Sequence, residues 1–151
     1  MDPVIEYLKD WTKHYFTNKD VIQKSILEII PNDQGLLIKK QDKEVLIIIK
    51  PDLQDLEALL ADKDKTGHYT LILLNNKHNF DKVNEAWNNI KMFPFLTIYF
   101  VNPFGETEHK WIIQPHVHEK ISDRTTFKTG LKTMFDTVPE ISVSDLQRKI
   151  A

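Results

Sequence analysis

The sequence contains no cysteine and only four glycines among its 151 residues. Without cysteine the chain can form no disulfide, no thiolate metal site and no cysteine nucleophile. The glycines stand singly, whereas loops that cradle phosphate need clustered glycines so that backbone amides can approach the phosphate oxygens. We therefore expect neither a nucleotide cofactor nor a nucleotide-binding enzyme.

Long apolar runs and a dominant charge are missing as well. The apolar runs are far shorter than the ~20 residues that a membrane-spanning helix needs, and the N-terminus has no apolar core of signal-peptide length. The 20 basic and 22 acidic residues leave a net charge of −2, which gives no general attraction to nucleic acid but leaves a local basic face open. These features predict a cytoplasmic protein without membrane contact, and its partner would be a protein or a nucleic acid.

Three apolar segments are the strongest positive signal in the chain. Residues 45–49, 69–74 and 95–101 are almost continuously apolar, which is typical of strands covered on both faces. Amphipathic helical patterns separate the three segments. This alternation predicts three parallel strands joined by helices, with Ile47 and Ile98 among the residues that lose all contact with solvent.

Two further segments, 36–40 and 110–117, are expected to pair with the outer parallel strands as antiparallel hairpin partners. The sequence thus predicts a single α/β domain over residues 1–151, with a five-stranded mixed sheet flanked by helices on both faces. N-terminal helices would occupy 1–31, the sheet core 32–121, and a C-terminal helix and tail 122–151.

The N-terminal region carries two helical patterns. Apolar residues between Val4 and Phe16 recur at spacings of three and four. The isoleucines between Val21 and Ile30 form a similar pattern that ends at Pro31. We expect two helices or one bent helix here, and the strand at 36–40 then lies at the edge of the sheet, where its lysines would suit it.

Polar residues follow each predicted parallel strand, at the edge where ligands of open α/β proteins usually bind. The candidate site residues are Asp52, Asn75, Asn76, Lys77 and Asn102. Together they would supply one carboxylate, one ammonium group and several amides. The alternative interpretation is that such residues only cap helices, with Asp52 and Asn79 as the caps.

Pro51-Asp52 followed by Asn75-Asn76-Lys77 resembles a degenerate PD-(D/E)XK signature of the restriction-endonuclease-like nucleases. The resemblance implies that Asp52 would hold a divalent metal and that Lys77 would help to activate water. Two departures weaken catalysis: Asn75 stands in place of the second carboxylate, and a helix separates the two motif strands where the family usually has a hairpin. We therefore expect a non-catalytic binding or interaction module, with an active metal-dependent nuclease as the alternative.

A histidine cluster is a second candidate site. His116 and His118 are two residues apart, so on a strand they would share one face and could both bind zinc, with His109 or a nearby glutamate as a third ligand. The alternative is that all three are partly exposed surface residues at the end of a strand.

Basic residues on the last predicted helix form a third candidate. Arg124, Lys128 and Lys132 recur at i, i+4 and i+8, so they would form one basic stripe that could contact phosphate. The first hairpin carries Lys39, Lys40 and Lys43. A solvated helix face explains the stripe equally well.

Overall fold

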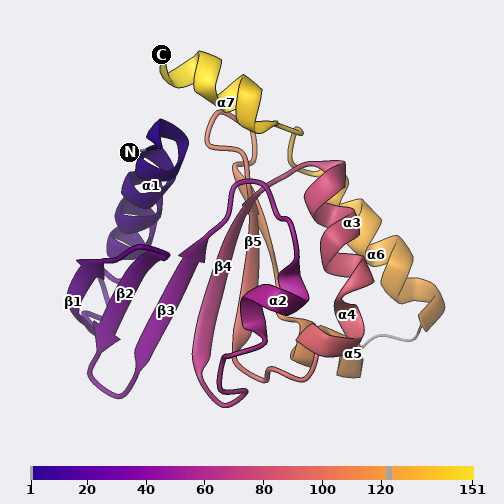
Figure 1. The fold of residues 1–151 in the computed structure, drawn as a ribbon, viewed down its shortest axis with the longest axis horizontal. Coiled ribbons are helices and arrows are strands. Elements are labelled where there is room, and N and C mark those ends of the chain that lie inside the picture. The colour runs from indigo at the N-terminus through magenta and orange to yellow at the C-terminus, as the bar shows by residue number, and fades with distance from the viewer. Residues whose placement is uncertain (1, 122–123) are drawn as a thin grey trace.

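The protein is a six-stranded mixed sheet with helices on both faces (Figure 1). The structure is a computed structural model that describes residues 2–121 and 124–151. The strands are β1 (Ile26–Pro31), β2 (Gly35–Lys40), β3 (Glu44–Ile49), β4 (His68–Leu74), β5 (Leu96–Val101) and β6 (Lys110–Ile113). The helices are α1 (Pro3–Lys19), α2 (Leu56–Leu60), α3 (Lys77–Glu85), α4 (Trp87–Ile90), α5 (Pro115–Ile121), α6 (Arg124–Asp136) and α7 (Val143–Ile150). In the described part of the chain, no helix is long and apolar enough to cross a membrane.

The strands lie in the sheet in the same order as in the sequence. The three central strands β3, β4 and β5 are parallel, as predicted, and β2 and β6 pair antiparallel with the outer two. Helix α2 connects β3 to β4, and helices α3 and α4 connect β4 to β5. All carboxyl ends of the parallel strands therefore meet at one edge of the sheet, which we call the carboxyl edge, and their starts meet at the opposite amino edge.

Two apolar cores cover the two faces of the sheet. Helices α1 and α7 pack on one face around residues such as Leu8, Ile47 and Leu146. Helices α2, α3, α4 and α6 pack on the other face around residues such as Ile98 and Phe100. Ile47, Ile72 and Ile98 are all 0% exposed, which confirms the predicted central strands.

The prediction of five strands was wrong, because residues expected in a second helix form the edge strand β1. A β-bulge between Ile26 and Glu28 inserts an extra residue, so Ile26 and Ile29 both pack on the face covered by α1. Their spacing of three resembles a helical stripe, whereas a regular strand would place them on opposite faces. The sheet core thus begins inside the region 1–31 that was expected to be helical.

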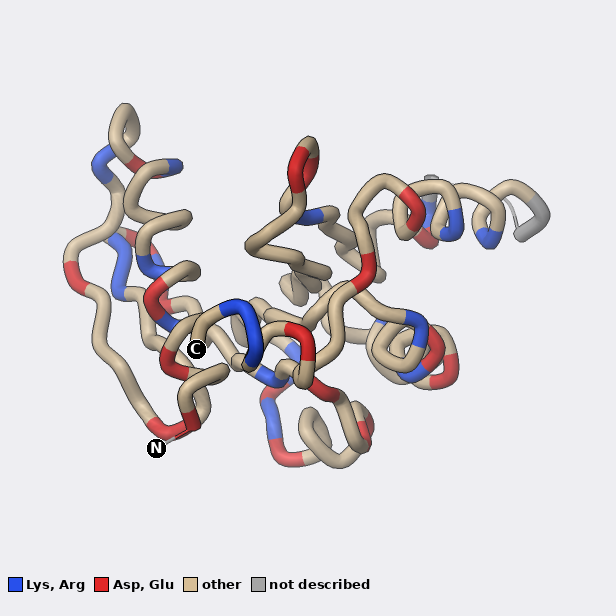
Figure 2. Tube along the Cα trace, turned by 90° about the horizontal axis from the view of Figure 1, so that it is seen from above, with Lys and Arg blue, Asp and Glu red and all other residues tan. Residues whose placement is uncertain are grey.

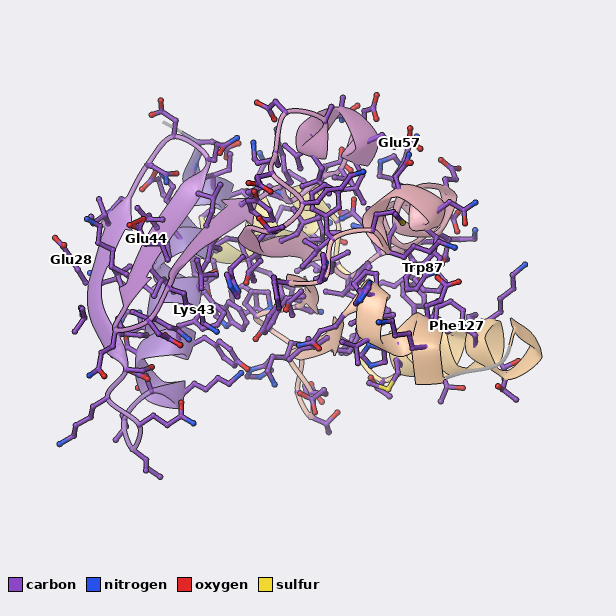
Figure 3. The ribbon with its side chains drawn as sticks, turned by 90° about the horizontal axis from the view of Figure 1, so that it is seen from below. Glu28, Lys43, Glu44, Glu57, Trp87 and Phe127 are labelled. Carbon is purple, nitrogen blue, oxygen red and sulfur yellow. The ribbon has the colours of Figure 1, made fainter. Side chains whose placement is uncertain are left out.

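Lys39 was expected on an edge strand, but β1 covers this side of β2. Lys39 lies opposite Glu28 on β1 and Glu44 on β3, so a lysine is flanked by two acidic residues across the sheet. Figure 3 labels both glutamates beside the hairpin of β2 and β3. Cross-strand charge pairing explains lysine in an inner strand.

A rigid loop connects α1 to β1. The Asp20 carboxylate accepts hydrogen bonds from the Ser25 hydroxyl at 2.6 Å and from the backbone amides of Ser25 and Ile26 at 3.0 and 2.8 Å. The bond from the Ser25 hydroxyl, followed by that from Ile26, holds the pKa of Asp20 below its usual value. Lys24 takes a positive φ of 52°, a conformation rare for residues other than glycine, because these bonds fix the turn.

Three element boundaries differ from the prediction. Helix α2 begins at Leu56 with Asp55 as its N-cap, so Asp52 is not the cap. Helix α3 begins at Lys77 with Asn76 as its N-cap, three residues before the expected start. Strand β6 ends at Ile113, and the following residues form α5 instead of the rest of a strand.

Replacing Ile47 by aspartate should unfold the domain, because the substitution places an unpaired charge in an apolar layer that excludes water. Ile22 offers a matched control, since the same side chain is 93% exposed there. We expect Ile22→Asp to melt within a few degrees of the wild type and Ile47→Asp to lack a cooperative thermal transition by circular dichroism. An Ile47→Asp variant as stable as the Ile22→Asp variant would contradict the placement of β3.

Candidate functional site

Asn75, which follows β4 at the carboxyl edge, is a buried anchor for the C-terminal part of the chain. Its side chain is 0% exposed and donates to the carbonyls of Val138 at 2.8 Å and Phe135 at 3.2 Å. Its amide oxygen accepts from the indole Nε1 of Trp111 at 2.8 Å. Its backbone carbonyl accepts from the amide of Ile141 at 2.9 Å. Both oxygens of Asn75 therefore already accept a hydrogen bond, and the side chain is buried away from solvent.

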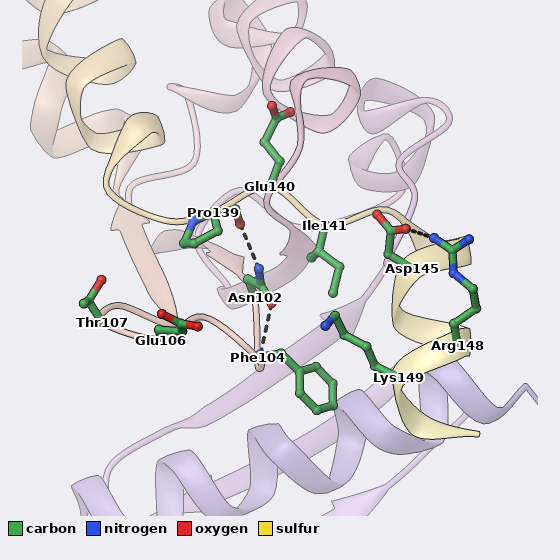
Figure 4. Close-up of a pocket in the computed structure, with 10 residues that line it drawn as sticks. All are labelled: Asn102, Phe104, Glu106, Thr107, Pro139, Glu140, Ile141, Asp145, Arg148 and Lys149. Carbon is green, nitrogen blue, oxygen red and sulfur yellow. Dashed lines mark hydrogen bonds and ion pairs between the residues drawn. The ribbon is translucent and has the colours of Figure 1, made fainter.

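Two more asparagines hold the same segment of chain, residues 135–141, which we call the C-terminal segment. The Asn76 amide donates to the Ile141 carbonyl at 3.0 Å. The Asn102 amide donates to the Pro139 carbonyl at 2.9 Å, and its oxygen accepts from the Phe104 amide at 3.0 Å (Figure 4). All three candidate asparagines at the carboxyl edge thus bind backbone groups of the chain itself.

Asn79 is also buried, and its side chain links the ends of neighbouring strands. Its oxygen accepts from the Leu53 amide at 2.8 Å, and its amide donates to the carbonyls of Pro51 and Leu74, both at 2.9 Å. The prediction that Asn79 caps a helix was wrong. The turn after β3 has few backbone partners of its own, so a side chain from α3 satisfies it.

Asp52 and Lys77, the residues that the nuclease resemblance assigns to catalysis, have separate partners. Asp52 is about half exposed, and its Oδ1 lies 3.4 Å from Nε2 of His78, which also lies 2.8 Å from the Leu53 carbonyl. The ammonium of Lys77 contacts Asp81 at 2.7 Å, and this hydrogen bond raises the pKa of Lys77.

Sequence reasoning missed two residues here, His78 and Glu140. His78 follows Lys77 directly, and the Glu140 carboxylate accepts from the Lys77 amide at 2.8 Å. Only the position of His78 beside the motif could have indicated a role. Glu140 is 63 residues from Lys77 in the sequence, so no local pattern pointed to it.

The chain matches no family model, no curated protein and no solved structure. Its function must therefore be inferred from the geometry of the chain itself.

The three candidate histidines do not gather into one cluster. His116 and His118 lie on helix α5, so the expected strand face was wrong. Nδ1 of His116 lies 2.9 Å from the Lys91 carbonyl, and Nδ1 of His118 lies 2.9 Å from the Gln114 carbonyl, while His109 is exposed before β6. Among residues 2–121 and 124–151, no group of three histidine, aspartate or glutamate side chains is placed to hold a metal ion.

The residues of the predicted basic stripe all lie on α6. Lys132 is exposed, but its ammonium contacts Asp136 at 2.6 Å and is therefore largely neutralised. Lys128 is exposed and lines the groove described below. Arg124 begins the helix, and its side chain lies outside the part of the structure that is described.

A cavity of about 740 Å³ lies at the carboxyl edge, between α7 and the loop that joins β5 to β6 (Figure 4). Helix α7 lies over this edge (Figures 1 and 2). The ammonium of Lys149 lies 5.5 Å from the centre of the Phe104 ring, and Arg148 pairs with Asp145. The cavity therefore mixes both signs of charge, and two of its cations already have partners.

A groove of about 730 Å³ runs between the α3–α4 pair and α6. Phe80, Trp87 and Phe127 line it, and Figure 3 shows the last two facing each other. The Trp87 indole donates to Glu119 at 2.6 Å, and Lys91 contacts the same carboxylate at 3.3 Å. The groove is an aromatic surface in which Trp87, Lys91 and Glu119 are bound to one another.

Replacing Asn75 by alanine should lower the free energy of unfolding by about 2–4 kcal/mol, because the carbonyls of Phe135 and Val138 and the indole of Trp111 would stay buried without partners. The exposed Asn84 is a matched control, and Asn84→Ala should change the stability by less than about 0.5 kcal/mol. Urea unfolding followed by tryptophan fluorescence measures both. Equal midpoints for Asn75→Ala and the wild type would mean that Asn75 does not anchor the C-terminal segment.

Proposed function

We propose that this domain is a non-catalytic binding or interaction module of the cytoplasm. The observation that carries the proposal is the filling of the carboxyl edge by the chain's own C-terminal segment. Ligands of open α/β folds usually bind at that edge, but here the amide groups of Asn75, Asn76 and Asn102 bind backbone carbonyls of the protein. These three amide groups are therefore not free to bind a substrate, and the cavity of about 740 Å³ beside them is lined by other residues of the edge.

The chemistry of the nuclease motif also supports this proposal. Metal-dependent hydrolysis of a phosphodiester needs at least two acidic oxygens on a hard cation and an activated water. Asp52 supplies one carboxylate, which lies beside His78. The position that the resemblance assigns to the second carboxylate is Asn75, whose neutral oxygen accepts the indole hydrogen of Trp111. The lysine of the motif is paired with Asp81.

One observation favours the alternative, an active metal-dependent nuclease of the restriction-endonuclease-like kind. Glu140 lies beside the amide of Lys77, so the C-terminal segment brings a carboxylate to the motif that the motif itself lacks. Glu140 and the half-exposed Asp52 would then be the two acidic residues of a metal site. A cleavage assay separates the two functions.

Purified protein should show no cleavage of single-stranded, duplex or branched DNA, or of RNA, with added magnesium or manganese. The physical reason is that only one carboxylate of the motif is present and that no second one replaces it in the sheet. Gel electrophoresis of labelled substrates measures the cleavage. Cleavage that disappears in Asp52→Ala, Lys77→Ala and Glu140→Gln variants, but persists in the control variant Lys128→Gln, would establish the nuclease.

A further inference from the structure

The amino edge of the sheet, opposite the carboxyl edge, carries another polar cavity, which we call the basic pocket. It has a volume of about 360 Å³ and lies between the C-terminal end of α1 and the starts of β3, β4 and β5. Its polar lining includes Lys19, Lys40, Lys43, His68, Thr97 and Gln114, and no acidic residue is among the described residues that line it. We infer that this pocket binds the phosphate backbone of single-stranded nucleic acid. The inference rests on the proposed role as a binding module and goes beyond it by naming the ligand.

Among the residues that the structure describes, the three lysines of the basic pocket have no carboxylate partner, and Lys19 lies 5.9 Å from the centre of the Tyr15 ring, a contact that leaves its positive charge intact. Within the described ranges none of them forms an ion pair, whereas seven other basic residues pair with a carboxylate elsewhere in the protein. Asp20, which attracts Lys40 from a distance, already accepts three hydrogen bonds from Ser25 and Ile26. Asp20 therefore offsets part of the charge of Lys40, while no ion pair among the described residues involves Lys19 or Lys43.

The lysines come from three separate elements, which the fold brings to one place. Lys19 is the last residue of α1, Lys40 is the last of β2, and Lys43 precedes β3 in the hairpin turn. Figure 3 views the molecule from this side and labels Lys43. Phe16 and Lys19 line the pocket, so the C-terminal end of α1 forms part of its wall. Three ammonium groups around one concave site attract a phosphate more strongly than three lysines spread over a surface.

An aromatic platform lies at the rim of the basic pocket. The rings of His68 and Phe95 stack with their centres 4.4 Å apart and their planes 19° apart. Phe95, which directly precedes the central strand β5, is 49% exposed, which is high for a phenylalanine. A planar base can stack on such a ring, and this contact accepts any base. Proteins that bind single strands combine a positive groove with aromatic platforms in this way.

The size and chemistry of the basic pocket favour a single strand over other anions. A concave site of this volume admits one phosphate with its sugar, whereas the rigid backbone of a duplex cannot enter it. The hydroxyls of Thr70 and Thr97 and the amide of Gln114 supply donors beside the lysines. The chain has no glycine-rich loop that would hold a di- or triphosphate by backbone amides, so lysine side chains carry the recognition.

Fluorescence anisotropy with labelled single-stranded RNA and DNA of about ten nucleotides tests the inference. The protein should bind at about 50 mM salt and weaken steeply as salt rises, because bound phosphates release counterions. Changing Lys19, Lys40 and Lys43 together to glutamine should weaken binding by at least about tenfold and reduce the slope of log K against log salt by about 2, since each phosphate contact to a single strand contributes about 0.7. Phe95→Ala should weaken binding by about fivefold or more, by removing the stacking platform.

A double variant, Lys128→Gln with Lys132→Gln, is the matched control, because both lysines lie on α6 away from the basic pocket. It should bind like the wild type, and circular dichroism should show every variant folded. The inference is wrong if the wild type does not bind at about 50 mM salt, if the triple variant binds like the wild type, or if only the α6 variant loses binding. Equally tight binding of a free mononucleotide, or tighter binding of an acidic protein or a duplex, would also overturn it. The assay contains a chelator and no divalent metal, so its result does not depend on the cleavage assay.

Discussion

The structure depends on a rule of polar chemistry, which is that a buried carbonyl or amide must have a hydrogen-bond partner. The C-terminal segment has no secondary structure where it crosses the carboxyl edge, so its carbonyls find no partner within their own helix or strand. Asn75, Asn76 and Asn102 supply those partners from the ends of β4 and β5. Asn79 does the same for the turn after β3. Four amide side chains thus bind together the sheet, the turn after β3 and the C-terminal segment.

This arrangement makes the two edges of the sheet different. At the carboxyl edge the asparagines satisfy the chain's own carbonyls, and of the charged residues around the cavity Arg148 pairs with Asp145, Lys149 lies over the Phe104 ring and Glu140 accepts from the Lys77 amide. At the amino edge three lysines stand around a pocket without a carboxylate to neutralise them. Three lysines thus gather around one cavity at the end of the sheet that folds of this type seldom use for ligands.

The central part of the fold could be predicted because its signal is local. Continuous apolar runs identify β3, β4 and β5, and the helical patterns between them fix the parallel arrangement. The edge strand β1 could not be predicted, because its bulge gives Ile26 and Ile29 a spacing that also fits a helix. The histidines of α5 were also predicted wrongly. Strand β6 ends at Ile113, and the helix that begins at Pro115 has no clear helical pattern in the sequence.

The roles of the site residues could not be predicted from the sequence. The candidate residues at the strand ends were placed correctly at the carboxyl edge, but their roles depend on partners far away in the chain. Asn75 binds carbonyls that are 60 and 63 residues distant, and the lysines of the basic pocket come from three elements. Contacts of this range follow from the packing of the whole domain and not from any local pattern.

Native-state hydrogen exchange tests the central claim that the C-terminal segment is an integral part of the sheet edge. The amide of Ile141 donates to the Asn75 carbonyl, and the amide of Asn75 donates to the Val101 carbonyl. If the asparagines hold the segment as described, the Ile141 amide should exchange only through global unfolding, at the same rate as the amides of β4. Exchange of Ile141 as fast as that of a frayed chain end, with β4 still protected, would contradict the account.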